Sequence, residues 1–169
     1  MTKTTIRGDT AQRHIHKYTN KNPLHRGALG NYFNVTAPEI IVLRPASILE
    51  FGCGEGLLAE QLVMRNAITG DYGGAGIRED AIQFARNRTP TGRFVCANIF
   101  QWPETGEKYD LVMACQVFEH LPDPRPYLER LLRLARGPVL LTVPFEPWFR
   151  LLNLARGRDI GRLGNHPEH

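Results

Sequence analysis

The sequence predicts an α/β domain in which a mainly parallel β-sheet is covered by helices on both faces. Short apolar segments alternate with amphipathic segments along most of the chain, and the links between them are short. The first apolar segment runs directly into a glycine-rich turn, Gly52 to Gly56, which leads into a helical segment. Parallel strands need crossover helices of this kind, and right-handed crossovers leave few topologies.

Each expected element follows from its apolar period and its flanking residues. Residues 22–42 are expected to be helical in one or two pieces, opened by Pro23 and interrupted at Gly30 and Pro38. The expected strands are 47–51, 72–77, 93–97, 109–115 and 139–143. The other expected helices are 57–65, 79–88, 124–136 and 148–156.

The helix over 124–136 has the most complete set of end signals. Asp123 is expected to be its N-cap, Pro124 occupies the first helical position, and Gly137 follows its end. Its expected apolar stripe consists of Leu128, Leu131, Leu132 and Ala135.

Composition is typical of one soluble domain: 42% of the 169 residues are hydrophobic and 22% are charged. The net charge is +4, but Lys and Arg are scattered rather than gathered in a stripe, so a nucleic-acid partner is not favoured. No apolar stretch is long enough for a membrane span and no signal peptide opens the chain, which predicts a cytoplasmic protein. Residues 1–22 are expected to form a flexible arm and residues 158–169 a polar tail.

Three cysteines, Cys53, Cys96 and Cys115, are each embedded in apolar sequence. Their odd number and wide spacing argue against both a disulfide framework and a zinc site. We expect three reduced, buried thiols.

The glycine turn indicates a nucleotide-binding loop, because glycine lets the backbone turn sharply and lets a ligand approach closely. Gly52, Gly54 and Gly56 are spaced G-x-G-x-G, whereas a dinucleotide fingerprint is G-x-G-x-x-G. The Gly-Lys-Ser/Thr of a phosphate-binding Walker loop is absent.

The segment ILEFGCGEG, residues 48–56, resembles motif I of the class I S-adenosylmethionine-dependent methyltransferases. The resemblance continues in order through GAGIREDAIQFAR, CANIF, YDLVMACQVFEHLPDP and LARGPVLLTVP, and it covers about residues 22–144. The chain is most similar in type to the ubiquinone-pathway O-methyltransferase group. The resemblance implies a Rossmann-like three-layer sandwich and S-adenosylmethionine as cofactor.

The resemblance also implies which residues line the cofactor site. The cofactor positions carried over from the family are Glu50, Gly52, Cys53, Gly54, Gly56, Gly76, Ile77, Asn98, Ile99 and Gln116.

Two of these positions depart from the family pattern. Gly76 stands where the second strand usually ends in an acid that holds the ribose hydroxyls. Either Glu79, Asp80 or a backbone group substitutes, or binding is weaker by roughly 1.5–3 kcal/mol. Asn98 stands where an acid is common; its oxygen would accept from the adenine amino group, or it would cap a turn.

A third departure concerns the end of the sheet. The family's sheet has seven strands, but after Pro144 we find only a helix and a polar tail. The core, residues 23–157, is therefore expected to lack the last two strands and to be a fragment or truncation of a longer enzyme. The fifth strand would then be an apolar edge, which predicts self-association through it.

Candidate catalytic groups follow the fourth expected strand. His120 is placed to act as a general base, because histidine titrates near neutrality. Glu119 and His120 also resemble the last two ligands of an E-x-x-E-H metal motif, but Gln116 occupies its first position and is a weaker ligand for a hard cation. Alternatively, the Glu-His pair pins the loop before Asp123. No metal ion is predicted.

The leading hypothesis is methyl transfer from S-adenosylmethionine to a small-molecule acceptor, most plausibly at oxygen. One alternative is RNA ribose 2′-O-methylation, which predicts a basic groove beside His120. The other is a truncated or degenerate Rossmann-like module without catalytic activity. No membrane partner is expected.

Overall fold

The computed structural model describes residues 23–68, 70–103 and 106–143. The chain divides into two compact units after Leu43, and each is considered by itself. The predicted arm over 1–22, the predicted helix over 148–156 and the predicted tail over 158–169 lie outside the described residues.

In the first unit, helix α2 runs without a break over Pro23–Leu43. Pro23 opens it as expected, but the predicted interruptions at Gly30 and Pro38 are wrong. An internal proline removes only one backbone donor, and a helix of 21 residues retains its other hydrogen bonds. A Cβ on Gly30 would meet no atom of the described residues within 4 Å outside the helix's own nearby backbone.

The second unit is built on a five-stranded sheet whose order is β3-β2-β1-β4-β5. Its strands are β1 (Ser47–Phe51), β2 (Asp71–Gly76), β3 (Arg93–Cys96), β4 (Leu111–Cys115) and β5 (Val139–Thr142). All four neighbouring pairs run parallel. The predicted strands are thus confirmed within two residues at each end.

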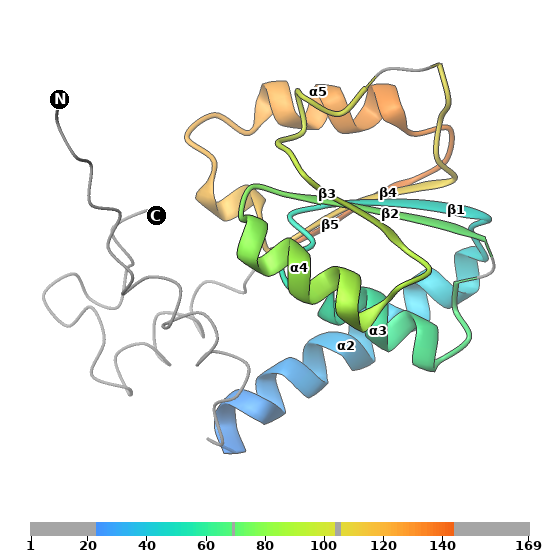
Figure 1. Ribbon diagram of the computed structural model, residues 1–169, viewed down its shortest axis with the longest axis vertical. Coiled ribbons are helices and arrows are strands. Elements are labelled where there is room, and N and C mark those ends of the chain that lie inside the picture. The colour runs from blue at the N-terminus through green and yellow to red at the C-terminus, as the bar shows by residue number, and fades with distance from the viewer. Residues whose placement is uncertain (1–22, 69, 104–105, 144–169) are drawn as a thin grey trace, which may run out of the picture. The chain divides into compact units, whose positions relative to one another are not determined.

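Helices cover both faces of this sheet (Figure 1). Helices α3 (Leu57–Met64) and α4 (Glu79–Arg88) lie on one face, and α5 (Arg125–Leu134) lies on the other. The predicted three-layer α/β fold is therefore confirmed. A short 3₁₀ turn, η1 (Phe118–His120), follows β4.

The main apolar core lies between the sheet and α5. It contains Leu49 and Phe51 of β1, Leu131 and Leu134 of α5, and Trp102 from the link between β3 and β4. Because side chains alternate along a strand, Glu50 points to the opposite face, toward α3 and α4.

Two predictions for α5 need correction. Helix α5 begins at Arg125, so Pro124 rather than Asp123 is the N-cap residue, although Asp123 Oδ1 still accepts from the Arg125 N–H at 3.1 Å. The predicted stripe is wrong at Leu128 and Leu132, which are exposed. The predicted stripe is confirmed at Leu131 and at Ala135, the residue that follows the helix, because both are buried. Arg130 and Leu134 are also buried, and Leu134 lies about one helical turn from Arg130 and Leu131.

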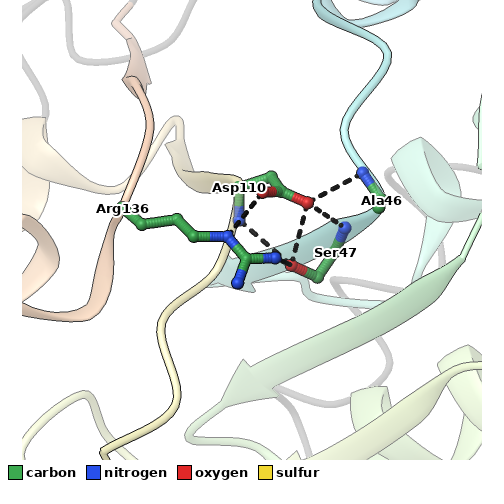
Figure 2. A network of polar contacts seen from close by, with 4 residues as sticks. All are labelled: Ala46, Ser47, Asp110 and Arg136. Atoms are coloured by element: carbon green, nitrogen blue, oxygen red, sulfur yellow. Dashed lines mark hydrogen bonds and ion pairs between the residues drawn. The ribbon is translucent and has the colours of Figure 1, made fainter.

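A polar network connects the amino ends of β1 and β4 with Arg136, which lies in the link after α5 (Figure 2). Asp110 Oδ2 accepts from the backbone N–H groups of Ala46 and Ser47, each at 2.9 Å, and Arg136 Nε donates to Asp110 Oδ1 at 2.6 Å. The hydrogen bond from Arg136 and the neighbouring backbone donors hold the pKa of Asp110 at about 2, although burial opposes this.

An open hollow lies beside this network, with Asp71, Arg93 and Lys108 among its lining residues. It is at the amino edge of the sheet, whereas parallel α/β sheets bind ligands outside the carboxyl ends of their strands. The carboxyl edge is therefore where we place the candidate functional site.

Candidate functional site

The glycine loop sits at the point where the strand order reverses. β1 is flanked by β2 on one side and β4 on the other, and the chain continues from β1 to β2 before returning to β4. In open α/β sheets this reversal leaves a crevice at the carboxyl ends, where ligands bind. Gly52, Gly54 and Gly56 follow β1 at this place.

Each glycine of the loop has a left-handed backbone, with φ of 75° at Gly52, 53° at Gly54 and 74° at Gly56. A Cβ on Gly52 would lie 2.2 Å from Val117 Cγ2, and a Cβ on Gly56 would lie 2.8 Å from Ala85 Cα. Among the described residues, a Cβ on Gly54 would meet only the loop's own Gly52 carbonyl, at 4.0 Å. Gly52 and Gly56 are thus fixed by packing, while Gly54 faces open space that a ligand can enter.

Backbone hydrogen bonds fasten the loop to the end of β2. The N–H groups of Gly52 and Cys53 both donate to the Ala75 carbonyl, at 2.8 and 3.2 Å. Gly56 N–H donates to the Cys53 carbonyl at 2.9 Å, which closes the turn before α3. The loop is consequently held beside Gly76, the next residue along β2.

Beneath the loop lies a buried polar cluster formed by Glu50, Tyr72 and Cys53. The Tyr72 hydroxyl donates to Glu50 Oε2. Burial raises the pKa of Glu50 from 4.5 to about 7, and the hydrogen bond from Tyr72 opposes that rise. Burial, and then the nearby Glu50 carboxyl, raise the pKa of both Cys53 and Tyr72. Glu50 is thus a buried carboxyl at the end of β1 that lies near Cys53 of the loop.

At the end of β2, Gly76 leaves room for a side chain. A Cβ there would lie 3.4 Å from Ile82 Cδ1 and 3.9 Å from Gly54 N, and no left-handed backbone is needed. Ile77 follows it and is 78% exposed. The two acids considered as substitutes are already in ion pairs, Glu79 with Arg86 at 2.9 Å and Asp80 with Arg78.

After β3, the Asn98 side chain caps a turn. Its Oδ1 accepts from Phe100 N–H at 2.9 Å and from Gln101 N–H at 3.1 Å. Ile99 beside it is buried. The turn-capping alternative for Asn98 is therefore what the structure shows, and its oxygen already has two donors.

After β4, Gln116 has a left-handed φ of 58°, which is uncommon for a residue other than glycine. Its N–H donates to the Thr142 carbonyl of β5 at 2.8 Å. His120 is exposed, and within the described part of the chain Glu119 Oε2 is buried without a hydrogen-bond partner. Residues 23–68, 70–103 and 106–143 contain no group of three or more His, Cys, Asp or Glu side chains that could hold a metal ion.

Three features were missed or mispredicted from the sequence. Cys96 is exposed, so the expectation of a buried thiol is wrong there, whereas Cys53 and Cys115 are buried and all three thiols are free. Val117 packs over Gly52, and Tyr72 pairs with Glu50. The register between β1 and β2 is the signal that links Tyr72 to Glu50. It places Tyr72 opposite Ile48 and therefore on the same face of the sheet as Glu50.

The fold and the loop define an α/β nucleotide-binding domain with its ligand site at the carboxyl edge. Residues 49–137, just over half of the chain, match the sequence profile of a family described as a methyltransferase domain. The chain belongs to this family, the class I S-adenosylmethionine-dependent methyltransferases.

Two groups of relatives illustrate the match. The chain is 27% identical over 100 residues to the ubiquinone biosynthesis O-methyltransferase of Coxiella burnetii, covering 57% of this chain and 42% of that protein. It is 38% identical over 95 residues to the trans-aconitate 2-methyltransferase of Rhizobium etli, covering 54% of this chain and 36% of that protein. The chain thus spans about two-fifths of the length of these relatives.

Solved structures share the fold. The plantazolicin methyltransferase BpumL, crystallised with a monoazolic desmethylPZN analog and SAH, matches with a TM-score of 0.58 at 20% identity, covering 86% of this chain and 62% of that one. The YcgJ protein from Bacillus subtilis matches with a TM-score of 0.58 at 15% identity, covering 75% of this chain and 58% of that one. No helix within the described ranges has the length and apolar character to cross a membrane.

Proposed function

We propose that this chain forms the cofactor-binding core of a methyltransferase that transfers a methyl group from S-adenosylmethionine to a small molecule. The observation that carries the proposal is Gly54, whose left-handed backbone faces open space at the strand-order reversal. When bound, S-adenosylmethionine supplies a methyl group on a sulfonium, and the protein mainly has to align a nucleophile with it.

The residues around the loop fit such a cofactor. Gly54 allows close approach of its methionine part, because no Cβ stands over the loop. Ile77, largely exposed beside Gly76, offers an apolar surface to the nucleoside. Gly52, Cys53 and Glu50 keep the loop in place, and Ile99, Asn98 and Gln116 complete the set of proposed cofactor positions.

We further propose oxygen as the methylated atom. The names of two relatives support an oxygen acceptor or an acidic small molecule: one is an O-methyltransferase and the other acts on trans-aconitate. His120, exposed after β4, is our candidate base for such an acceptor. Ribose methylation of RNA is not favoured, because the relatives named above are a ubiquinone biosynthesis enzyme and a trans-aconitate methyltransferase.

The edge strand β5 is our candidate surface for self-association. Among the described residues it pairs only with β4, and Leu141 on it is 38% exposed. An apolar edge strand presents unpaired backbone groups to a second copy.

The proposal is tested by calorimetric titration of the purified chain with S-adenosylhomocysteine, with NAD as the control ligand. We expect micromolar binding of S-adenosylhomocysteine and none of NAD, because the loop lacks the dinucleotide spacing. A folded chain that binds neither ligand contradicts the proposed function.

Restoring an acid at the end of β2 should tighten binding. Gly76→Asp is expected to lower the Kd for S-adenosylhomocysteine by roughly tenfold or more, because one charged hydrogen-bond partner contributes about 1.5–3 kcal/mol. The site tolerates the side chain, since its Cβ would make only ordinary contacts. Gly76→Asn, which has the same shape without the charge, is the matched control in the same titration. Equal Kd values for Gly76→Asp and the wild type would show that the ribose lies elsewhere.

A further inference from the structure

The described part of the link between β3 and β4 that runs over residues 97–103 contains no helix, yet it is fixed in detail. Residues 97–103 form turns and a bend. Asn98 Oδ1 accepts two N–H groups of the segment, and Gln101 Oε1 accepts from Asn98 N–H at 2.9 Å. These bonds shape the turn but do not attach it to the rest of the fold, so some other contact must.

One such contact is the hydrogen bond from Ala97 N–H to the Gly76 carbonyl of β2 at 2.9 Å, and another comes from Arg130 of α5. The guanidinium donates from Nη2 to the Trp102 carbonyl at 2.6 Å and from Nε to the Ile99 carbonyl at 3.3 Å. Arg130 is only 6% exposed. An arginine remains charged even when buried, and burial of a charge is costly unless polar groups compensate for it. The two carbonyl oxygens therefore help to stabilise the buried guanidinium, and its hydrogen bonds fix the positions of both carbonyls.

Aromatic contacts complete the attachment. The Trp102 ring packs edge-on against Phe51 of β1, with centroids 5.9 Å apart, and the half-exposed Phe100 lies 4.9 Å from the ring of Tyr127 on α5. Arg130 and Tyr127 lie nearly one helical turn apart, so a single face of α5 contacts Ile99, Phe100 and Trp102.

We propose that Arg130 is a positioning residue that sets the adenine side of the cofactor site through the backbone of residues 98–102. This inference rests on the proposed function. Since the Asn98 oxygen is used inside the turn, recognition of the base passes to backbone groups of this segment. A backbone group discriminates between bases only when its position is fixed, and Arg130 supplies that fixation.

The test compares variants of the intact chain. Arg130→Met removes both hydrogen bonds but keeps an apolar side chain of similar length. We expect its Kd for S-adenosylhomocysteine to rise about tenfold or more, which corresponds to losing an aligned polar contact. Its preference for S-adenosylhomocysteine over S-inosylhomocysteine should also shrink, because only the edge of the base differs between these two ligands.

Arg130→Lys keeps the charge and the reach to one carbonyl, so we expect partial rescue of both affinity and base preference; it also replaces Arg130→Met if that variant does not fold. Arg136→Met is the matched control. Arg136 lies just after α5 and also donates a hydrogen bond, but its acceptor is Asp110 at the amino edge of the sheet. This control should lower the unfolding midpoint and leave the Kd and the base preference unchanged.

Hydrogen exchange supplies a readout that does not depend on ligand. In Arg130→Met, amides of residues 98–102 should exchange faster than in the wild type, while those of β1 should not. Folded Arg130 variants with wild-type base preference and wild-type exchange would overturn the inference. If the wild type itself fails to bind S-adenosylhomocysteine, the proposed function fails and this inference fails with it; binding by the wild type with unchanged variants refutes the inference alone.

Discussion

Gly52→Ala and Gly56→Ala are expected to destabilise the protein by about 2–5 kcal/mol each. Placing a Cβ on a left-handed residue costs roughly 1–2 kcal/mol, and overpacking a filled site adds about 1–3 kcal/mol. At Gly52 the new methyl group meets Val117 Cγ2, and at Gly56 it meets the backbone of Ala85 on α4. The measurement is urea unfolding of the three proteins at one pH.

Gly54→Ala is the matched comparison. Gly54 has the same left-handed backbone but open space above it. We therefore expect Gly54→Ala to lower the free energy of unfolding by only the roughly 1–2 kcal/mol that a Cβ costs on a left-handed residue. Its methyl group would nevertheless stand where the ligand approaches, so the affinity for S-adenosylhomocysteine should fall by at least about tenfold. Equal destabilisation by all three substitutions would mean that backbone strain alone governs this loop.

A double variant separates strain from crowding at Gly52. In Gly52→Ala with Val117→Ala, the clashing Cγ2 atom is gone, so the double variant should be more stable than the sum of the two single losses predicts. The same cycle is not available at Gly56, because Ala85 Cα, a backbone atom that no substitution removes, opposes the new methyl group at 2.8 Å together with Ala85 Cβ.

Most of the fold could be predicted from the sequence, because its signals are local. Strand β1 and helix α4 have their predicted bounds, since an apolar run and an acidic first turn mark them directly. The errors have separate causes: one internal proline leaves the other hydrogen bonds of α2 in place, and tertiary packing overrides the local signal in α5. Pro38 does not interrupt α2, and the core-facing side of α5 includes Arg130, which a hydrophobic stripe excludes by definition.

The candidate site could be predicted less completely. The spacing of its glycines indicated the loop, but Val117 and Ala85, which make Gly52 and Gly56 obligatory, are 65 and 29 residues distant in the sequence from their glycine partners. The pairing of Tyr72 with Glu50 likewise depends on the register between β1 and β2. Contacts of this range carry no periodic signal, so only the folded chain reveals them.

The burial of the Glu50 carboxyl makes the stability of the protein depend on pH. Burial raises the pKa of Glu50 from 4.5 to about 7 in the folded protein, so the folded state favours the protonated carboxyl. The resulting stabilisation is fully present below pH 4.5 and is lost as the pH rises to about 7. Over that window the free energy of unfolding should fall by about 3 kcal/mol from this group.

Glu50→Gln should remove that dependence, because glutamine stays neutral while its oxygen can still accept from the Tyr72 hydroxyl. We expect the wild type and Glu50→Gln to have similar stability at pH 4.5, and the variant to be the more stable by about 3 kcal/mol at pH 8. Tyr72→Phe acts in the opposite direction: the lost hydrogen bond no longer lowers the pKa of Glu50, so the loss of stability should extend to higher pH than in the wild type. Urea midpoints measured from pH 4.5 to 8 distinguish the three proteins, and parallel curves for the wild type and Glu50→Gln would show that Glu50 is ionised in the fold throughout this range. Because this carboxyl lies beneath the glycine loop and has a pKa of about 7, the stability of the candidate cofactor site should follow the same titration and be greatest when Glu50 is protonated.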